Sequence, residues 1–390
     1  MISKEHYFDW AATSPADSEI LKKALELSLE HWANPSSIHA AGVDAKTSLE
    51  EARAKCAKIL GVKSETLFFT SGGTESDHIP LLSVLTRPQK GSIILSSIEH
   101  PALREMSKML TNLGWKVIFV NPDKNGFVSS QSILDAIQDD TVFVSVMAVN
   151  NETGAIQNVY EIADKLLEVS SGRRKIFFHI DCVQAAGKIP LDLNHKGIDS
   201  AAFSAHKICG PRGIGLLYLN KEINGFLKGG GQEKNVRSGT ENLFGAQAMA
   251  LCLEKYFISK NQNMERFEEQ RKITSDFIQK ILTIKGASII PHCRSDKAFE
   301  DKFSPWIVQA SFKGIPGQVM ERALSSKGFF ISTGSACSAS KHSRPVLDSM
   351  GIGAEEKEDA VRFSFGFEST ENSINELYEA VKSVAELFAK

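Results

Sequence analysis

The stretch Phe203-Ser204-Ala205-His206-Lys207 stands mid-chain, between a strand-like apolar run and a glycine-rich loop. It places a lysine just beyond a strand end, with a hydroxyl and an imidazole beside it. A lysine held in such a pocket has a lowered pKa and becomes a nucleophile toward carbonyl groups. Because most lysines are solvated surface residues, this pattern needs support from elsewhere in the chain.

A second apolar run, residues 176–180, comes before this stretch and is followed by Asp181. In open α/β sheets, ligands bind beyond the carboxyl ends of the strands. A carboxylate there can keep the pyridine nitrogen of pyridoxal phosphate (PLP) protonated, and a lysine can hold that cofactor as a Schiff base. Taken alone, Asp181 fits a turn or a helix cap better. Its pairing with Lys207 on successive strand ends favours a PLP site.

Strand-like and helix-like segments alternate through most of the chain, which predicts a mostly parallel, doubly wound sheet. The predicted strands of this sheet are residues 67–70, 92–95, 116–120, 141–149, 176–180, 201–203 and 215–219. A helix at 264–284 is expected to join this part to a smaller α+β part, with strands near 307–311, 329–331 and 361–365. We expect a large PLP-binding domain at residues 15–258. Residues 1–14 and 259–390 would form the small domain that carries a cysteine loop.

The composition limits the class of protein. The chain has 390 residues, of which 42% are hydrophobic, and a formal net charge of −2, which favours neither nucleic acid nor an anionic membrane as a partner. The N-terminus lacks the apolar core of a signal peptide, and no apolar run approaches the roughly 20 residues of a membrane span. The cysteines lack the spacing of a zinc site or a disulfide framework, so no metal is expected and a cytoplasmic location is favoured.

A glycine-rich turn with hydroxyl side chains, Ser71 to Ser76, follows the first predicted strand. A strand, such a turn and a helix start together form an arrangement that binds phosphate at the N-terminal N–H groups of the helix. The turn has neither the lysine of a Walker A loop nor the spacing of a dinucleotide fingerprint. A turn without a ligand is an equally good interpretation of this segment alone.

Two further residues have a structural and a functional interpretation. Cys337 lies in a run of small residues, where a mobile loop would make its thiol accessible, although most free cysteines are buried and inert. Arg362 is a charge inside an alternating apolar strand. A buried guanidinium needs an anionic partner, which a substrate carboxylate or a structural salt bridge would supply equally well.

Taken together, these residues resemble the cysteine desulfurases of the NifS/IscS type, class V members of the fold-type I PLP-dependent transferases. The resemblance runs from Tyr7 to about Phe367. It rests on Asn34-Pro35-Ser36-Ser37, Thr70-Ser71-Gly72-Gly73-Thr74-Glu75-Ser76, Glu99-His100, Val149-Asn150-Asn151-Glu152, His179-Ile180-Asp181, Ser204-Ala205-His206-Lys207, Arg237-Ser238-Gly239-Thr240, Gly334-Ser335-Ala336-Cys337 and Arg362-Phe363-Ser364. It implies an α/β protein with a large, mostly parallel, doubly wound sheet domain and a small α+β C-terminal domain.

The resemblance implies which residues bind the cofactor. Lys207 carries PLP, and Asp181 pairs with the pyridine nitrogen. Gln184 and Asn151 contact the phenolate side of the ring. The phosphate is bound by Gly73, Thr74, Ser204 and His206 and, from the partner subunit of a homodimer, by Thr240.

The resemblance also implies the reaction. L-Cysteine is the substrate, and Asn34 and Arg362 hold its carboxylate. The implied catalytic residues are Lys207, which removes the α-proton, His100, which stacks on the ring, and Cys337, which takes the sulfur as a persulfide. L-Alanine is released, and the sulfur passes to an acceptor protein for iron–sulfur cluster assembly or tRNA thiolation.

Other functions stay open at this point. A class V aminotransferase or a selenocysteine lyase shares Lys207 and Asp181, and an aminotransferase does not need Cys337. A non-catalytic sulfur carrier or scaffold protein would keep the fold without turnover, but the chain retains Lys207, Asp181 and Arg362.

The chain also departs from the family pattern. Trp10 replaces a small or polar residue and is expected beside the active-site entrance. Gly73 replaces an alanine, and Pro101 replaces a lysine. The chain ends at Lys390, without the longer tail that some relatives use to dock a scaffold protein.

Overall fold

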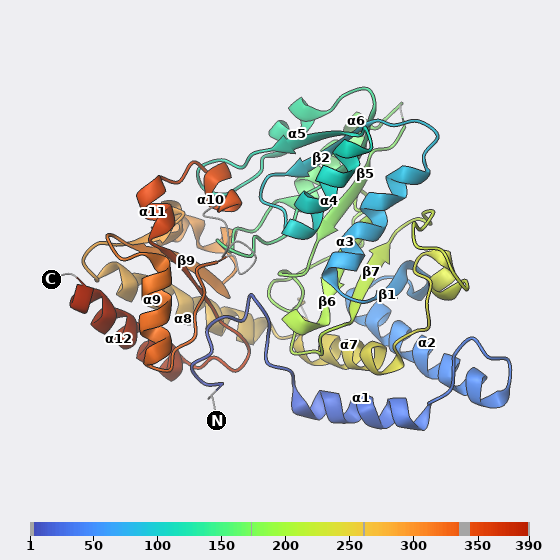
Figure 1. Ribbon diagram of the computed structural model, residues 1–390, viewed down its shortest axis with the longest axis horizontal. Coiled ribbons are helices and arrows are strands. Elements are labelled where there is room, and N and C mark those ends of the chain that lie inside the picture. Colours follow the sequence, from blue (N-terminus) through green and yellow to red (C-terminus); the bar gives the residue numbers. More distant parts are fainter. Residues whose placement is uncertain (1–3, 173, 260–261, 335–343, 389–390) are drawn as a thin grey trace.

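The computed structural model describes residues 4–172, 174–259, 262–334 and 344–388, which are organised around two sheets (Figure 1). The large sheet has the order β1-β7-β6-β5-β4-β2-β3. Its strands are β1 Leu67–Thr70, β2 Ser92–Ser96, β3 Lys116–Val120, β4 Thr141–Ser145, β5 Phe177–Asp181, β6 Ser200–Ser204 and β7 Gly215–Leu219. All neighbouring strands from β6 to β3 are parallel, and β7 is antiparallel to both β1 and β6. The predicted fold class is therefore confirmed.

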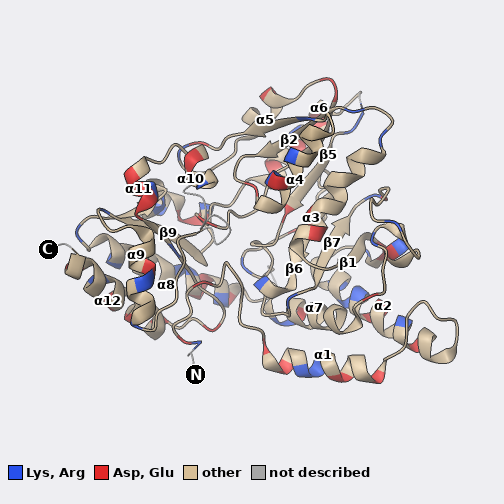
Figure 2. Ribbon diagram, viewed as in Figure 1, with Lys and Arg blue, Asp and Glu red and all other residues tan. Residues whose placement is uncertain are grey.

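The large sheet is an interior layer. Every residue of β2, β4, β6 and β7 is buried, as expected for strands covered by helices on both faces, whereas the edge strand β3 is partly exposed. The helices of this part are α1 Ser18–Glu30, α2 Ala40–Leu60, α3 Gly73–Leu82, α4 Pro101–Asn112, α5 Ser130–Ala136, α6 Val159–Val169 and α7 Leu243–Tyr256. α7 packs against α1 and α2, while α3 lies across β5, β6 and β7. Figure 2 shows that charged residues gather on helices such as α1, whereas the strands carry few.

The small sheet is antiparallel, with the order β10-β9-β8. Its strands are β8 Ala287–Ile290, β9 Ile307–Phe312 and β10 Ala360–Ser364. The helices of this part are α8 Met264–Leu282, α9 Gly317–Ser326, α10 Pro345–Ser349, α11 Ala354–Glu358 and α12 Glu371–Phe388. β8 was not predicted. The strand has only four residues, and only its second half is buried, so its sequence has no alternating apolar pattern.

Two predicted strands differ from the structure. The segment 329–331 is not a strand: Phe330 forms an isolated bridge with Tyr7, and Ser332 forms another with Arg362, so neighbouring residues pair with different partners. The strand predicted at 141–149 ends as a strand at Ser145. Its apolar continuation is buried, and burial alone does not distinguish a strand from a buried connection.

The N-terminal segment crosses to the small sheet. The Phe8 N–H donates to the carbonyl oxygen of Phe330 at 2.7 Å, and the Ser364 N–H donates to the carbonyl oxygen of Phe8 at 2.8 Å. These contacts support our proposal that residues 1–14 belong with residues 259–390, and the exact domain limits stay a prediction. Among the described residues, no helix has both the length and the apolar character that a membrane span requires.

Candidate active site

A cavity of about 310 Å³ opens at the carboxyl ends of the parallel strands, where the large sheet faces the small one. Residues from α3, from the loops after β2, β4, β5 and β6, and from β10 line it. The predicted site residues among them are Gly73, Thr74, His100, Asn151, Asp181, Gln184, Ser204, His206, Lys207 and Arg362. One cavity therefore brings together most of the residues that the sequence singled out.

Lys207 ends a short 3₁₀ turn, Ala205–Lys207, that directly follows β6. Its Nζ donates to the carbonyl oxygens of Ala11 at 2.6 Å and Ala12 at 2.7 Å. Because strands β5 and β6 are parallel and in register, with Asp181 opposite Ala202, the lysine and the carboxylate leave the sheet at the same edge. The amine is thus held at the cavity wall by an N-terminal segment that is remote in sequence.

Asp181 is buried at the end of β5, and its Oδ1 accepts a hydrogen bond from the N–H of Val183 at 2.8 Å. Burial, together with the nearby carboxylate of Asp77, raises the pKa of Asp181 to about 8. An ionised carboxylate in this position is costly unless a cation approaches it. A protonated pyridine nitrogen is such a cation, so this end of the cavity fits the PLP ring.

Sequence reasoning missed a polar cluster beneath Asp181. The Nε2 of His179 lies 3.1 Å from Oδ1 of Asp77, and its Nδ1 lies 2.7 Å from the Oγ of Ser200. Burial lowers the pKa of His179 to about 4 and raises that of Asp77 well above its usual range. A signal was available, because His179 is two residues before Asp181 on a strand and so shares its face of the sheet.

Glu99 is a second missed carboxylate at the cavity wall. It is buried, and its Oε1 accepts from the N–H of Met147 at 2.7 Å and from the Oγ of Ser96 at 2.5 Å. Burial raises its pKa to about 7. These bonds tie the loop after β2, which carries His100, to the end of β4.

The phosphate end of the cavity is formed at the start of α3. Gly72 is the N-cap and supplies no side-chain cap, so the first N–H groups of the helix stay available for an anion. Ser204 lines the cavity beside this helix start. A Cβ on Gly73 would lie 2.7 Å from Cγ2 of Val183, which explains why glycine stands where the family pattern has alanine.

Two imidazoles beside Lys207 are held neutral. Burial, followed by the positive charge of Lys207, lowers the pKa of His100 to about 4 and that of His206 to about 3. His100 is the N-cap of α4, where its Nδ1 accepts from the N–H of Ala102 at 3.2 Å. Pro101 occupies the first position of this helix, where no N–H donor is needed. Pro101 thus suits a helix start, and His100 keeps Nε2 as its donor.

Arg362 joins the substrate side of the cavity to the N-terminal segment. It is 2% exposed, and its Nη2 lies 2.7 Å from Oδ1 of Asp9. Its Nη1 donates to the carbonyl oxygens of Asn151 at 2.8 Å and Gly334 at 2.9 Å. Its buried Nε has no hydrogen-bond partner among the described residues. Arg362 therefore forms a structural ion pair with Asp9, and it also lines the cavity where a substrate carboxylate would bind.

Two predicted residues, Asn34 and Thr240, are not brought to this cavity. Asn34 is exposed in the loop before α2, where its Oδ1 accepts from the N–H of Ser36 at 2.9 Å. Thr240 is also exposed and does not line the cavity. Cys337 lies outside the described residues. The roles given to these three residues stay predictions.

The expected position of Trp10 beside the entrance is wrong. Trp10 is 3% exposed and belongs to the hydrophobic core. It packs so closely on Gly366 that a Cβ there would lie 2.0 Å from the indole ring. The neighbouring residue Ala11, rather than Trp10, reaches the cavity.

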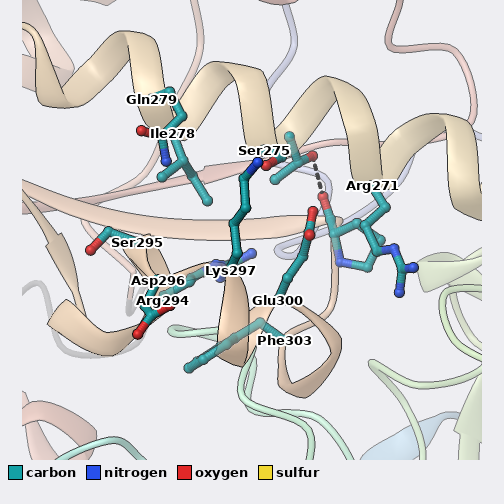
Figure 3. A pocket seen from close by; sticks show the side chains of 12 residues that line it. Arg271, Ser275, Ile278, Gln279, Arg294, Ser295, Asp296, Lys297, Glu300 and Phe303 are labelled. Atoms are coloured by element: carbon teal, nitrogen blue, oxygen red, sulfur yellow. Dashed lines mark hydrogen bonds between the residues drawn. The ribbon is translucent and has the colours of Figure 1, made fainter.

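A second, smaller hollow lies between α8 and the segment 294–305 (Figure 3). Its volume is about 30 Å³, which is room for water rather than for a cofactor. In this hollow Arg294 donates from Nη1 to the carbonyl oxygen of Thr153 at 2.6 Å and from Nη2 to that of Ser304 at 2.8 Å. We interpret it as a support for the loop that carries Asn151.

The fold and the cavity define an enzyme of the class that carries PLP on a lysine. The aminotransferase class-V family model matches residues 6–377, and the chain belongs to this family, whose cofactor is PLP.

Relatives in this family extend over nearly the whole chain. A protein named cysteine desulfurase IscS from Dictyoglomus turgidum is 34% identical over 99% of this chain and 95% of its own length. One of the same name from Methanosarcina thermophila is 34% identical over 98% of this chain and 93% of its own length.

Solved structures agree with these relatives. A NifS-like protein superimposes with a TM-score of 0.87 and 33% identity, covering 98% of this chain and 100% of that one. A structure described as SspA in complex with cysteine has a TM-score of 0.77 and 28% identity, covering 92% of this chain and 98% of that one. The resemblance noted in the sequence is thereby confirmed.

Proposed function

We propose that this chain is a PLP-dependent cysteine desulfurase. It transfers the sulfur of L-cysteine to the thiol of Cys337 and releases L-alanine. The observation that carries the proposal is that one cavity contains Lys207, the buried Asp181 and Arg362, which are the groups that the reaction needs for cofactor and substrate. Relatives that match nearly the whole chain bear the name cysteine desulfurase, and one related solved structure is described as containing cysteine.

The bound cofactor supplies an electron sink for the carbanion that forms when the α-proton leaves. In our proposal the amine of Lys207 takes that proton, and the negative charge of Asp181 keeps the ring nitrogen protonated. Neutral His100, which lines the cavity with Nε2 as its donor, would pass a proton.

Arg362, which lines the cavity, orients the substrate carboxylate, while Asp9 holds Nη2 of the guanidinium. The sulfur atom leaves L-cysteine, a C–H bond replaces its C–S bond, and the Cys337 thiol becomes a persulfide. The reaction therefore balances without an external oxidant or reductant.

We further propose a homodimer and a cytoplasmic location. Ile38 and Trp32 flank Asn34 and are 98% and 75% exposed, and such bulky apolar side chains favour contact with another protein surface. In a homodimer, Asn34 and Thr240 would act at the partner's cavity. The cysteines within the described ranges are free, which fits a reducing compartment. A sulfur acceptor protein would then discharge Cys337.

The experiment compares the wild-type protein with Cys337→Ser and Lys207→Ala. With L-cysteine, we expect the wild type to form alanine in amounts equal to the sulfur that a thiol reductant releases. Cys337→Ser should keep the visible absorption of bound PLP but lose sulfur release, and Lys207→Ala should lose the covalent cofactor. A Cys337→Ser enzyme that exchanges amino groups between an amino acid and a keto acid would instead identify an aminotransferase.

A further inference from the structure

A second lysine, Lys188, lies buried next to the cavity. It is 4% exposed, and its Nζ donates to Oε1 of Gln184 at 2.5 Å. The Nε2 of Gln184 donates to the carbonyl oxygen of Ala11 at 2.9 Å, and Lys207 donates to the same oxygen at 2.6 Å. A continuous chain of hydrogen bonds therefore links the two lysines through Gln184 and Ala11.

The position of Lys188 is costly for folding. In the described part of the chain it forms no ion pair. The charged groups that face it are the cations Lys207 and Arg362, and the imidazole of His206 and the thiol of Cys209 are further titratable neighbours. Burial, and then these two cations, lower the pKa of Lys188 to about 7. Burying an amine without a carboxylate destabilises a fold, so stability does not account for this lysine.

The backbone at this lysine is fixed by a residue that leads into the small sheet. The indole Nε1 of Trp306, just before β9 of the small sheet, donates to the carbonyl oxygen of Lys188 at 2.7 Å. Because both its backbone and its side chain are held, Lys188 presents its amine to Gln184 in a single direction.

Below its pKa of about 7, Lys188 is an ammonium group, which has three donors and no acceptor. Next to it, the amide of Gln184 must turn Oε1 toward Lys188 and Nε2 toward Ala11 and the cavity. We propose that Lys188 is a positioning residue that fixes this orientation and polarises the amide, so that Gln184 presents a strong N–H donor to an anionic oxygen on the cofactor ring. This inference rests on the proposed function, in which Gln184 contacts the phenolate side of PLP.

The inference has a spectroscopic consequence. A stronger donor stabilises the ring phenolate as an anion with less help from the proton on the neighbouring Schiff-base nitrogen. Lys188 therefore lowers the pKa of that proton, which is followed through the visible absorption of the bound cofactor. A lysine that only fills space would leave this pKa unchanged.

The test uses the PLP-loaded enzyme and the variant Lys188→Met, whose side chain is also unbranched. Titrating the visible absorption against pH should give a midpoint about one pH unit higher in the variant than in the wild type. Lys188→Arg keeps a cationic donor and should retain most of the wild-type midpoint. Lys196→Met, which removes an exposed lysine from the same connection, is the matched control and should not move it.

A double variant tests the path through Gln184. If Lys188 acts through the amide, Lys188→Met should add little to the shift that Gln184→Met already causes. An unchanged midpoint in Lys188→Met with normal PLP content overturns the inference, and so does a full additional shift in the Gln184→Met background. If Lys188→Met does not fold, Gln184→Glu, which pairs with Lys188 but cannot donate, should raise the midpoint, and an unmoved midpoint again overturns the inference. A wild-type protein without bound PLP would refute the proposed function itself.

Discussion

The two sides of the cavity are built in different ways. The cofactor side is formed by the end of β5, the turn after β6 and the start of α3, which carry Asp181, Lys207 and Gly73. The substrate side depends on Arg362 from the small sheet and on Asp9 from the N-terminal segment. The predicted cofactor-binding residues therefore come from the part built on the large sheet, although carbonyl oxygens of the N-terminal segment hold Lys207. The substrate side exists only where separate parts of the chain meet.

This difference suggests that cofactor binding and substrate recognition can be disturbed separately. Residues on rigid elements hold a cofactor in a fixed place, as catalytic geometry requires. A guanidinium that bridges two parts of the chain can hold the substrate only while those parts keep their relative position. Variants on the cofactor side should change the bound PLP, and variants on the substrate side should spare it.

The largest effect is expected for Lys207→Ala. Because the amine both carries PLP and moves the α-proton in our proposal, alanine formation should fall by at least about 10³-fold. Borohydride reduction followed by peptide mapping should find the cofactor on Lys207 in the wild type and on no peptide in the variant. A variant with a wild-type rate would contradict the assignment of this lysine.

A smaller loss is expected for Arg362→Gln. It removes a positive charge from the lining of the substrate side, so kcat/KM for L-cysteine should fall by about 10²-fold, mainly through KM. The absorption spectrum of bound PLP should stay as in the wild type. Arg322→Gln, on α9 and away from the cavity lining, is the control. Loss of the cofactor spectrum in Arg362→Gln would show that the two sides are not separable.

Asp9→Asn should have a still weaker effect. The amide oxygen can still accept from Nη2 of Arg362, but the buried guanidinium loses its anionic partner. We expect KM for L-cysteine to rise by about tenfold, which corresponds to about 1.4 kcal/mol. Asp44→Asn, which removes a carboxylate from the surface of α2, should leave KM as it is. If Asp9→Asn also leaves KM unchanged, the ion pair serves the fold alone.

The sequence predicted the cofactor side better than the substrate side, and the reason is physical. Asp181 and Lys207 end apolar runs, so strand alternation alone brings them to one edge of a sheet. The partner of Arg362 could not be foreseen, because Asp9 lies 353 residues away and reaches it through bridges between short segments. Lys188 is not part of any motif that the sequence analysis identified. Its burial and its hydrogen bond to Gln184 are visible only in the structure. Trp10 was misplaced because a residue next to cavity-lining residues can still point into the core.

Gly73→Ala tests the tightest contact on the cofactor side and should have the smallest effect. The new Cβ would lie 2.7 Å from Cγ2 of Val183, so this side chain must shift. Overpacking of this kind costs about 1–3 kcal/mol, and the low end applies because a side chain rather than backbone has to move. We expect PLP to bind about fivefold more weakly, measured by titrating the apoprotein.

Val183→Ala should restore the affinity of Gly73→Ala, since it removes the methyl group that the new Cβ meets. The double variant would then show that the glycine is required by its neighbour rather than by the phosphate. If Gly73→Ala still binds PLP weakly in the Val183→Ala background, the close approach that matters is that of the phosphate to the helix N-terminus. We expect the affinity to be restored, because the family pattern has alanine at this position. An alanine Cβ is therefore compatible with the cofactor when the side chain that faces it leaves room.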